Sequence, residues 1–198
     1  MLLSKIIICV CFQYSLTSSL DVSKLEIEKV SSVIISHFLT LSHLIQDVGN
    51  KAAVFPLQLL GFDVDIINSV HFSNHTGYPN RWEGDVLDGN KLLKLVDGLD
   101  RNGLLHDDSI ESDPGRVGHI LTGYIGSESF LRAVVKIVQK LKGLNSKCRY
   151  VCDPVLGDAG KFYVPIELVD IYRKEVLSLA SSVLLKLAAI DVARTICY

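Results

Sequence analysis

The sequence lacks the features that mark several common classes of protein. Its 198 residues contain no Cys-x-x-Cys pair, so a structural zinc site has no support. It has no run of lysine and arginine, and its formal net charge is −2, which argues against a nucleic acid as partner. The apolar run at residues 6–12 is far too short to span a bilayer, so no membrane partner is expected.

Cysteine usage and the N-terminus bear on the compartment. Cys148 and Cys152 are close in the sequence, but a strand would hold them roughly 13 Å apart, too far for a disulfide. The five cysteines therefore favour a reducing compartment, and we expect a cytoplasmic protein. Residues 1–19 combine Lys5, the apolar run and two small serines, which is the pattern of a signal peptide. The alternative is a non-native extension, because nothing downstream is typical of a secreted protein.

The rest of the chain has the pattern of one α/β domain. Hydrophobic residues make up 48% and charged residues 21%, which is ordinary for a globular protein. Strands alternate with helices, which implies a parallel sheet with right-handed crossovers. Periodicity and turn residues predict strands at 62–70, 117–122 and 149–152, an exposed loop at 106–116, and helices at 51–60, 90–99, 127–143 and 165–178.

Polar side chains follow the predicted strands. Ligands of parallel sheets bind at the carboxyl ends of strands, so residues 70–78, 122–124 and 153–158 are expected to converge at one edge. In the first segment, Thr76 offers a hydroxyl next to the bare backbone of Gly77, which suits a small polar ligand. Capping of the turn is the alternative role of this threonine.

The third segment carries two carboxylates. Asp153 and Asp158 frame a Pro-Val-Leu-Gly loop at the expected sheet edge. Carboxylates there can hold Mg²⁺, or water around it, against the phosphates of a nucleotide, because Mg²⁺ takes few protein ligands. Helix or turn capping is the alternative role of each.

Two runs of residues carry a resemblance to a known family. They are Asn68-Ser-Val-His-Phe-Ser-Asn-His-Thr-Gly-Tyr78 and Tyr150-Val-Cys-Asp-Pro-Val-Leu-Gly-Asp158. Together they closely resemble the pyridoxal kinases of the ribokinase-like superfamily. The resemblance implies a three-layer α/β/α fold with a mostly parallel sheet. It also implies transfer of phosphate from ATP to the 5′-hydroxyl of pyridoxal, pyridoxine or pyridoxamine, in pyridoxal 5′-phosphate salvage. The related hydroxymethylpyrimidine kinases fit the two runs less well.

The resemblance also implies roles for individual residues. Val70 and Phe72 would line the pyridine ring of the vitamin, Thr76 would contact its polar substituents, and Tyr124 would border the pocket. Ser42 matches the family's vitamin-contacting serine, in a segment one residue shorter than in relatives.

On the nucleotide side, the resemblance places Asp153 and Asp158 near the phosphates, with Asp153 as a Mg²⁺ ligand. Tyr163 matches a tyrosine of the family's flexible flap, although the stretch from Asp158 to Tyr163 is shorter than in some relatives. The implied cofactors are ATP with Mg²⁺, with a monovalent cation as a further candidate.

The resemblance covers residues 48–180, and both ends depart from it. Residues 1–47 form a divergent extension and residues 181–198 a divergent tail, in which residues 183–193 are expected to form a short helix. No Gly-x-Gly-Asp occurs in the sequence, so the family's Gly-Thr-Gly-Asp motif and its catalytic base are absent and no catalytic residue is assigned. The expectation is a kinase-like chain, truncated in its C-terminal half, that is inactive alone and marginally stable. The alternative is a non-catalytic isoform that binds B6 vitamers or pairs with full-length subunits, since the family forms homodimers.

Overall fold

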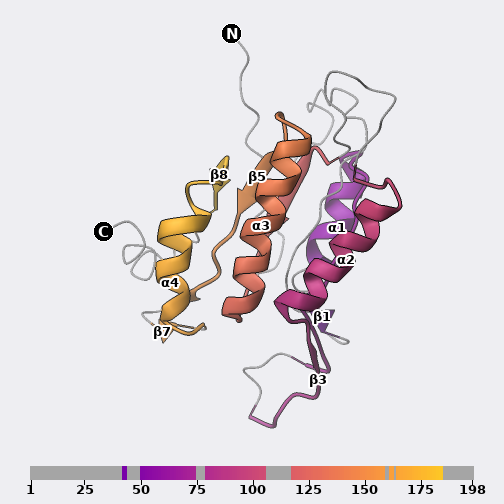
Figure 1. Ribbon diagram of the computed structural model, residues 1–198. Coiled ribbons are helices and arrows are strands. Elements are labelled where there is room, and N and C mark those ends of the chain that lie inside the picture. The colour runs from indigo at the N-terminus through magenta and orange to yellow at the C-terminus, as the bar shows by residue number, and fades with distance from the viewer. Residues whose placement is uncertain are drawn as a thin grey trace.

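The computed structural model describes residues 42–43, 50–74, 79–105, 117–158, 161–162 and 164–184 (Figure 1). Most of the expected N-terminal extension, the expected loop at 106–116 and the last part of the tail lie outside these residues. The elements are β1 Ser42–His43, α1 Asn50–Leu59, β2 Val70–Phe72, β3 Gly84–Val86, α2 Gly89–Arg101, β4 His119–Thr122, α3 Glu128–Leu144, β5 Arg149–Cys152, β6 Gly157–Asp158, β7 Lys161–Phe162, α4 Glu167–Ile171, η2 Tyr172–Val176 and β8 Ser182–Val183.

A parallel sheet lies at the centre of the fold. Strand β5 lies between β4 and β8 and pairs in parallel with both. The register joins His119 to Arg149 and Thr122 to Cys152, so β4 and β5 end level with each other. Both this parallel pairing and the bounds of β5 confirm the prediction from the sequence.

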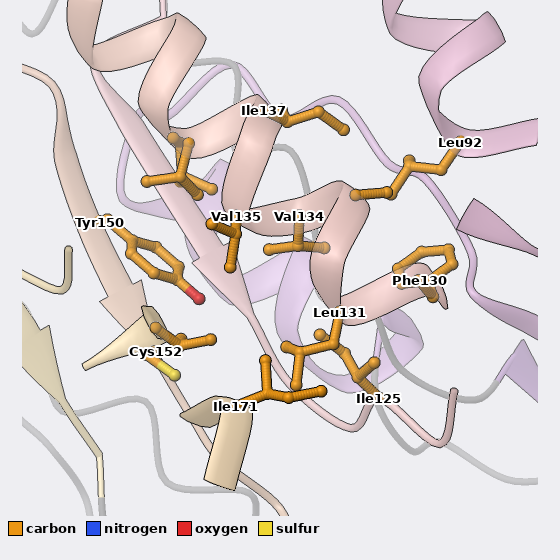
Figure 2. Packing of buried hydrophobic residues seen from close by; sticks show 14 of the residues in the cluster. Leu92, Ile125, Phe130, Leu131, Val134, Val135, Ile137, Tyr150, Cys152 and Ile171 are labelled. Atoms are coloured by element: carbon orange, nitrogen blue, oxygen red, sulfur yellow. The ribbon is translucent and has the colours of Figure 1, made fainter. Parts of the chain in front are cut away.

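Helices cover both faces of this sheet. Helices α2, α3 and α4 lie side by side on one face, with α3 in contact with both of its neighbours (Figure 1). Because successive strand residues point to opposite faces, Tyr150 and Cys152 join the core beneath α3 (Figure 2). Leu121 and Val151 point the other way and pack against Ala53 and the rest of the small cluster around α1. The expected three-layer α/β/α arrangement is therefore present.

Helix α3 contributes more buried residues to the central core than any other described element, because one of its faces is apolar at helical spacing. Burying each large apolar side chain stabilises the fold by about 1.5–3 kcal/mol relative to leaving it exposed. On the opposite face, Arg132 Nε pairs with Glu128 at 2.9 Å, an exposed contact that adds little. The buried residues of α3 are Phe130, Leu131, Ala133, Val134, Val135, Ile137, Val138 and Leu141.

None of the helices among the described residues is long and apolar enough to cross a membrane.

The start of α2 is fixed by a cap and by a close helix contact. The Asp88 carboxylate accepts a hydrogen bond from the backbone N–H of Lys91, as an N-cap residue does. Gly89 follows, and a Cβ at this position would lie 2.1 Å from the carbonyl oxygen of Ser129 at the start of α3. Glycine therefore allows the two helices to approach at this point.

Helix α1 ends where the sequence predicted, at a glycine with left-handed backbone. Gly61 has φ +84°, and its N–H donates to the carbonyl of Gln58 while the N–H of Phe62 donates to that of Leu57. This pair of bonds is a Schellman motif, in which an apolar contact follows the helix end. Phe62 makes that contact, because it packs on the cluster that contains Leu57.

The predicted strand at 62–70 was wrong over most of its length. Only Val70–Phe72 forms a strand, β2, which pairs in parallel with β1 and antiparallel with β3 in a second three-stranded sheet. Phe62 and Val64 are still directed inward, where they pack against α1 and Leu121. The alternation of apolar residues thus reports which side is buried, and it does not specify a hydrogen-bonded neighbour.

The expected helix at 165–178 consists of an α-helix, α4, followed directly by a π-helical turn, η2. After α4, the N–H of Leu177 donates to the carbonyl of Tyr172 at 2.9 Å, five residues back, as in a π-helix. The wider turn places Val176 in the core and leaves Glu175 outside, where it binds Arg132 at 2.7 Å. An unbroken α-helix would bring Glu175 toward the buried position instead.

The tail begins with an edge strand of the parallel sheet. Ser182 and Val183 form β8 against Val151 and Cys152. Val183 is therefore not the first residue of a helix, as the sequence had suggested, because the apolar side chains here also suit an edge strand. The remainder of the predicted helix lies outside the described residues.

Candidate site at the carboxyl ends of the strands

The ends of β4 and β5 bring two of the predicted site segments together. The N–H of Asp153 donates to the carbonyl of Thr122 at 2.8 Å, so the parallel ladder continues one step beyond β5. Gly123 and Tyr124 follow directly after Thr122, and they leave the sheet beside Asp153. A half-buried carboxylate and a half-buried phenol therefore emerge from neighbouring strands at one edge, as the parallel topology requires.

Tyr124 lies in a partly dry environment. Burial raises the pKa of its hydroxyl above the usual value for tyrosine, so the side chain stays a neutral hydrogen-bonding group at physiological pH. A Cβ on Gly126 would lie 2.6 Å from the Tyr124 hydroxyl oxygen, so glycine at that position leaves room for this hydroxyl.

The first predicted segment, which starts at Val70, begins in the other sheet. Strand β2 presents Val70 and Phe72 to the interior and His71 to solvent, in the alternation expected of a strand. Figure 1 shows β1, β3 and β7 at the lower end of the molecule, where α3 begins. The hydrogen-bonded ladder thus joins two of the three segments that the sequence placed at one edge, and β2 lies in a separate sheet.

The structure adds a residue that the sequence analysis missed. The rings of Phe72 and Trp82 face each other with centroids 3.8 Å apart and planes inclined by 32°. Phe72 is buried, whereas Trp82 keeps 38% of its surface exposed. The stacked pair makes a flat apolar surface with one accessible member. A signal was available, because Trp82 is the single tryptophan of the chain.

Glycine at position 84 makes the approach of β3 to β2 possible. Gly84 pairs with Phe72 and has φ +142°, a conformation that side-chain-bearing residues rarely adopt. A Cβ there would lie 2.0 Å from the carbonyl oxygen of His71. The short segment between Trp82 and this glycine therefore follows β2 closely.

A second contact ties β2 to α1. The Asn50 side-chain amide at the start of α1 donates to the Asn68 side-chain carbonyl, just before β2. Asn50 is 3% exposed whereas Asn68 is exposed, so this bond runs from the interior to the surface. It links the first turn of α1 to the segment that leads into Val70 and Phe72.

The remaining predicted site residues are placed only in part. Ser42 lies in β1 and pairs with His71, and Asp158 lies in β6 and pairs with Lys161. The side chains of Ser42 and Asp158, and the whole of Thr76 and Tyr163, lie outside the described residues. The short stretch before Tyr163 is a hairpin, β6–β7, which the sequence analysis did not anticipate.

The side chains that could bind a metal ion are few at any one place in the described parts of the chain. Within the described parts of the chain, no group of three or more His, Cys, Asp or Glu side chains could enclose a metal. Mg²⁺ commonly binds one or two carboxylates and completes its shell with water and substrate phosphates. A single carboxylate at a strand end, as Asp153 provides, fits that mode of binding and does not fit a protein-only cage.

The chain has known relatives, although no protein-family model matches it. It is 55% identical to the pyridoxal kinase of Arabidopsis thaliana over 141 residues, which is 71% of this chain and 42% of that one. It is 47% identical to the human pyridoxal kinase over 144 residues, covering 70% of this chain and 43% of the relative. The chain thus spans about two fifths of the length of the curated relatives it matches.

Solved structures give the same result for the fold. The pyridoxal kinase of Leishmania donovani in complex with ADP and pyridoxamine superposes with a TM-score of 0.67 at 31% identity, over 85% of this chain and 61% of that one. The pyridoxal kinase of Trypanosoma brucei gives a TM-score of 0.61 at 29% identity, over 84% of this chain and 59% of that one. The fold is that of the ribokinase-like α/β kinases. Within that class, the chain is related to the pyridoxal kinases over about 70% of its residues.

Proposed function

We propose that this chain provides the vitamin side and part of the nucleotide side of a pyridoxal kinase site. The observation that supports this most is the bond from the Asp153 N–H to the Thr122 carbonyl, because it sets a carboxylate beside Tyr124 at a strand edge. The relatives are kinases of pyridoxal, and solved structures hold ADP together with pyridoxamine or pyridoxine. The reaction would transfer the γ-phosphate of ATP to the 5′-hydroxyl of a B6 vitamer.

The vitamin would bind against apolar surface with a few polar contacts. Trp82 offers an accessible aromatic face that is backed by Phe72, and Val70 lies on the same side of β2 as Phe72. A pyridine ring binds well to such a surface, because stacking uses the full area of its face. Tyr124, Thr76 and Ser42 would supply hydrogen bonds to its substituents, in the roles that the resemblance assigns.

The nucleotide would approach the ends of β4 and β5. Asp153 would hold Mg²⁺, which neutralises charge on the transferring phosphate, while Asp158 and Tyr163 would complete the phosphate side. A monovalent cation is a further candidate ligand of the same region.

Binding without turnover is the second candidate function. The specific observation in its favour is that the sequence contains no Gly-x-Gly-Asp, which would supply the base for the 5′-hydroxyl. These 198 residues by themselves would then bind both ligands and transfer phosphate only slowly, because they do not supply that proton acceptor. A homodimer is part of the same proposal, and sedimentation would test it against the 21.8 kDa mass of one chain.

Calorimetric titration of the 198-residue chain with pyridoxal and with MgADP tests the proposal. Asp153→Asn is expected to weaken MgADP binding roughly tenfold or more, as loss of a charged contact does, and to leave pyridoxal binding unchanged. Asp63→Asn, at an exposed carboxylate after α1, is the matched control and should change neither affinity. Absence of binding by both ligands would refute the proposal. Production of pyridoxal phosphate from MgATP would reject the second candidate function.

A further inference from the structure

Three polar side chains are enclosed directly beneath the candidate site. The hydroxyl groups of Thr122 and Tyr150 lie 2.8 Å apart, and the residues are 1% and 0% exposed. Cys152 is also 0% exposed, and it pairs with Thr122 across the ladder and belongs to the same core as Tyr150. Figure 2 shows Tyr150 and Cys152 next to each other below α3. We call Thr122, Tyr150 and Cys152 the buried polar cluster.

Packing alone does not require this cluster. Phenylalanine and valine would fill nearly the same space, and a buried polar group lowers stability unless it is hydrogen-bonded. The bond between Thr122 and Tyr150 runs diagonally between strands, because Thr122 pairs with Cys152 and Tyr150 pairs with Ile120. It therefore adds a side-chain contact to the backbone ladder, which already holds the register of β4 and β5.

The cluster acts on the residue that joins the two site segments. Thr122 is the last residue of β4, and its carbonyl accepts the N–H of Asp153. Its side chain is held by Tyr150, and Tyr124 follows it by two positions. A shift of Thr122 that follows loss of its hydroxyl contact would therefore move its carbonyl, which binds the Asp153 N–H, and would also move Tyr124, two residues further along the chain.

Tyr172 closes the cluster from the side of η2. It is 1% exposed and belongs to the same core as Tyr150 and Cys152. Burial raises the pKa of its hydroxyl well above the usual value, and negative charge on Cys152, Asp153 and Tyr124 raises that pKa further. The π-helical turn therefore brings a fourth polar side chain into electrostatic range of both site residues.

We propose that the buried polar cluster positions Tyr124 and Asp153 relative to each other for ligand binding. Its members are positioning residues, because they are enclosed in the core and not accessible to a ligand. The proposal rests on the proposed function for the ligands themselves. It explains why a hydroxyl pair occupies a site where apolar residues would pack.

The test uses the 198-residue chain with matched variants. Thr122→Val and Tyr150→Phe each remove one hydroxyl with little change of shape, and Thr122→Ser retains the hydroxyl. Cys148→Ala is the control, because Cys148 is also buried in this core, directly before β5 and at the end away from the site. Two quantities are measured in each variant: hydrogen exchange at the Asp153 amide, and the Kd values for pyridoxal and MgADP.

Loss of the Thr122–Tyr150 bond should speed Asp153 amide exchange roughly tenfold and weaken both ligands about threefold to tenfold. The double variant should be no worse than either single variant, because both remove the same bond. Thr122→Ser should resemble the parent chain. Cys148→Ala should lower the thermal midpoint without changing exchange at Asp153 or either Kd.

Unchanged exchange at Asp153 in both hydroxyl-deleting variants would overturn the proposal. Faster exchange with unchanged ligand affinities would overturn it as well, since the cluster would then support only the fold. If the parent chain binds neither ligand, the proposed function fails and ligand positioning fails with it. The exchange data separate that failure from a failure of the cluster to hold the strand ends. If Tyr150→Phe does not fold, the comparison of Thr122→Val with Thr122→Ser decides the matter.

Discussion

The rings of Phe72 and Trp82 stack with their centroids 3.8 Å apart, which joins a buried residue of β2 to an exposed residue before β3. The stack lies on the strand that we propose for the vitamin side, so one ring supports the fold and the other is accessible to a ligand. The two residues should therefore respond differently to truncation.

Truncation of Phe72 should cost more stability than truncation of Trp82. Phe72→Ala removes a ring that is 4% exposed and should lower the free energy of unfolding by about 3–5 kcal/mol. Trp82→Ala removes a ring that is 38% exposed, so it loses about 0.5–1.5 kcal/mol of ring pairing together with only part of the burial of a full ring, and its total cost should stay below that of Phe72→Ala. Urea denaturation measures both. Phe55→Ala, at a residue that is 64% exposed, is the control and should stay within about 0.5 kcal/mol of the parent. Equal losses for Phe72 and Trp82 would contradict this division of roles.

Elements whose own side chains determine their structure could be predicted from the sequence. Helix α3 has its apolar face at helical spacing, and β5 has the bounds that its residues predicted. The segment after α1 was wrongly predicted as a strand. Its apolar residues Phe62 and Val64 indicate which side is buried, but they do not indicate whether a neighbouring strand is present to pair with. The π turn at Tyr172 was missed for a similar reason. The sequence alone does not show that the helix must widen by one residue for Val176 to reach the core.

The candidate site was predictable to the extent that topology determines it. Parallel strands that end level with each other bring Tyr124 and Asp153 to one edge, and that much followed from the element order. The contact of Trp82 with Phe72 depends on β3, an antiparallel strand with the unfavourable sequence Gly-Asp-Val. Pairing with β2 makes it a strand, so local propensity gave no indication of it.

Two glycines of α2 should respond in opposite ways to alanine. Gly89→Ala would place a Cβ 2.1 Å from the Ser129 carbonyl oxygen, which forces α2 and α3 apart and should lower stability by about 1–3 kcal/mol. At Gly98 a Cβ meets nothing within 4 Å, so Gly98→Ala should raise stability by roughly 0.5–1 kcal/mol through helix propensity. Thermal and urea unfolding of the pair measure the difference. A gain in stability from Gly89→Ala would show that the helices do not approach as closely as the structure indicates.

The cap of α2 should make stability depend on acid pH. The backbone N–H of Lys91 is the main cause that lowers the pKa of Asp88 below its usual value of 3.8. A depressed folded-state pKa means that this stabilisation is present above the unfolded-state value and is lost as pH falls through the lower folded-state value. Asp88→Asn retains an oxygen acceptor but removes the charge, so its thermal midpoint should fall less than that of the parent chain between pH 5 and about 3. Parallel curves for the two proteins would show that the Asp88 charge does not contribute.

Buried thiols should make stability depend on alkaline pH in the opposite sense. Burial raises the pKa of the Cys152 thiol from 9.0 to about 11, with Tyr150 and Thr122 opposing the shift. Burial likewise raises the pKa of Cys148 to about 11, against the charge of Lys142. A raised folded-state pKa gives stability that is complete below pH 9, the unfolded-state value, and that is lost as pH rises toward 11.

The double variant Cys148→Ala/Cys152→Ala isolates the contribution of these thiols. Its stability should be lower than that of the parent at pH 7, because two buried groups have been truncated, but it should fall less steeply between pH 8 and 10. The interval stops at pH 10 because the buried tyrosines Tyr150 and Tyr172 contribute a loss of the same sign at higher pH, where exposed tyrosines ionise. Urea midpoints at half-unit steps of pH measure the two slopes. Equal slopes would mean that the thiols ionise in the folded protein as readily as in the unfolded chain, which is incompatible with a closed core around β5.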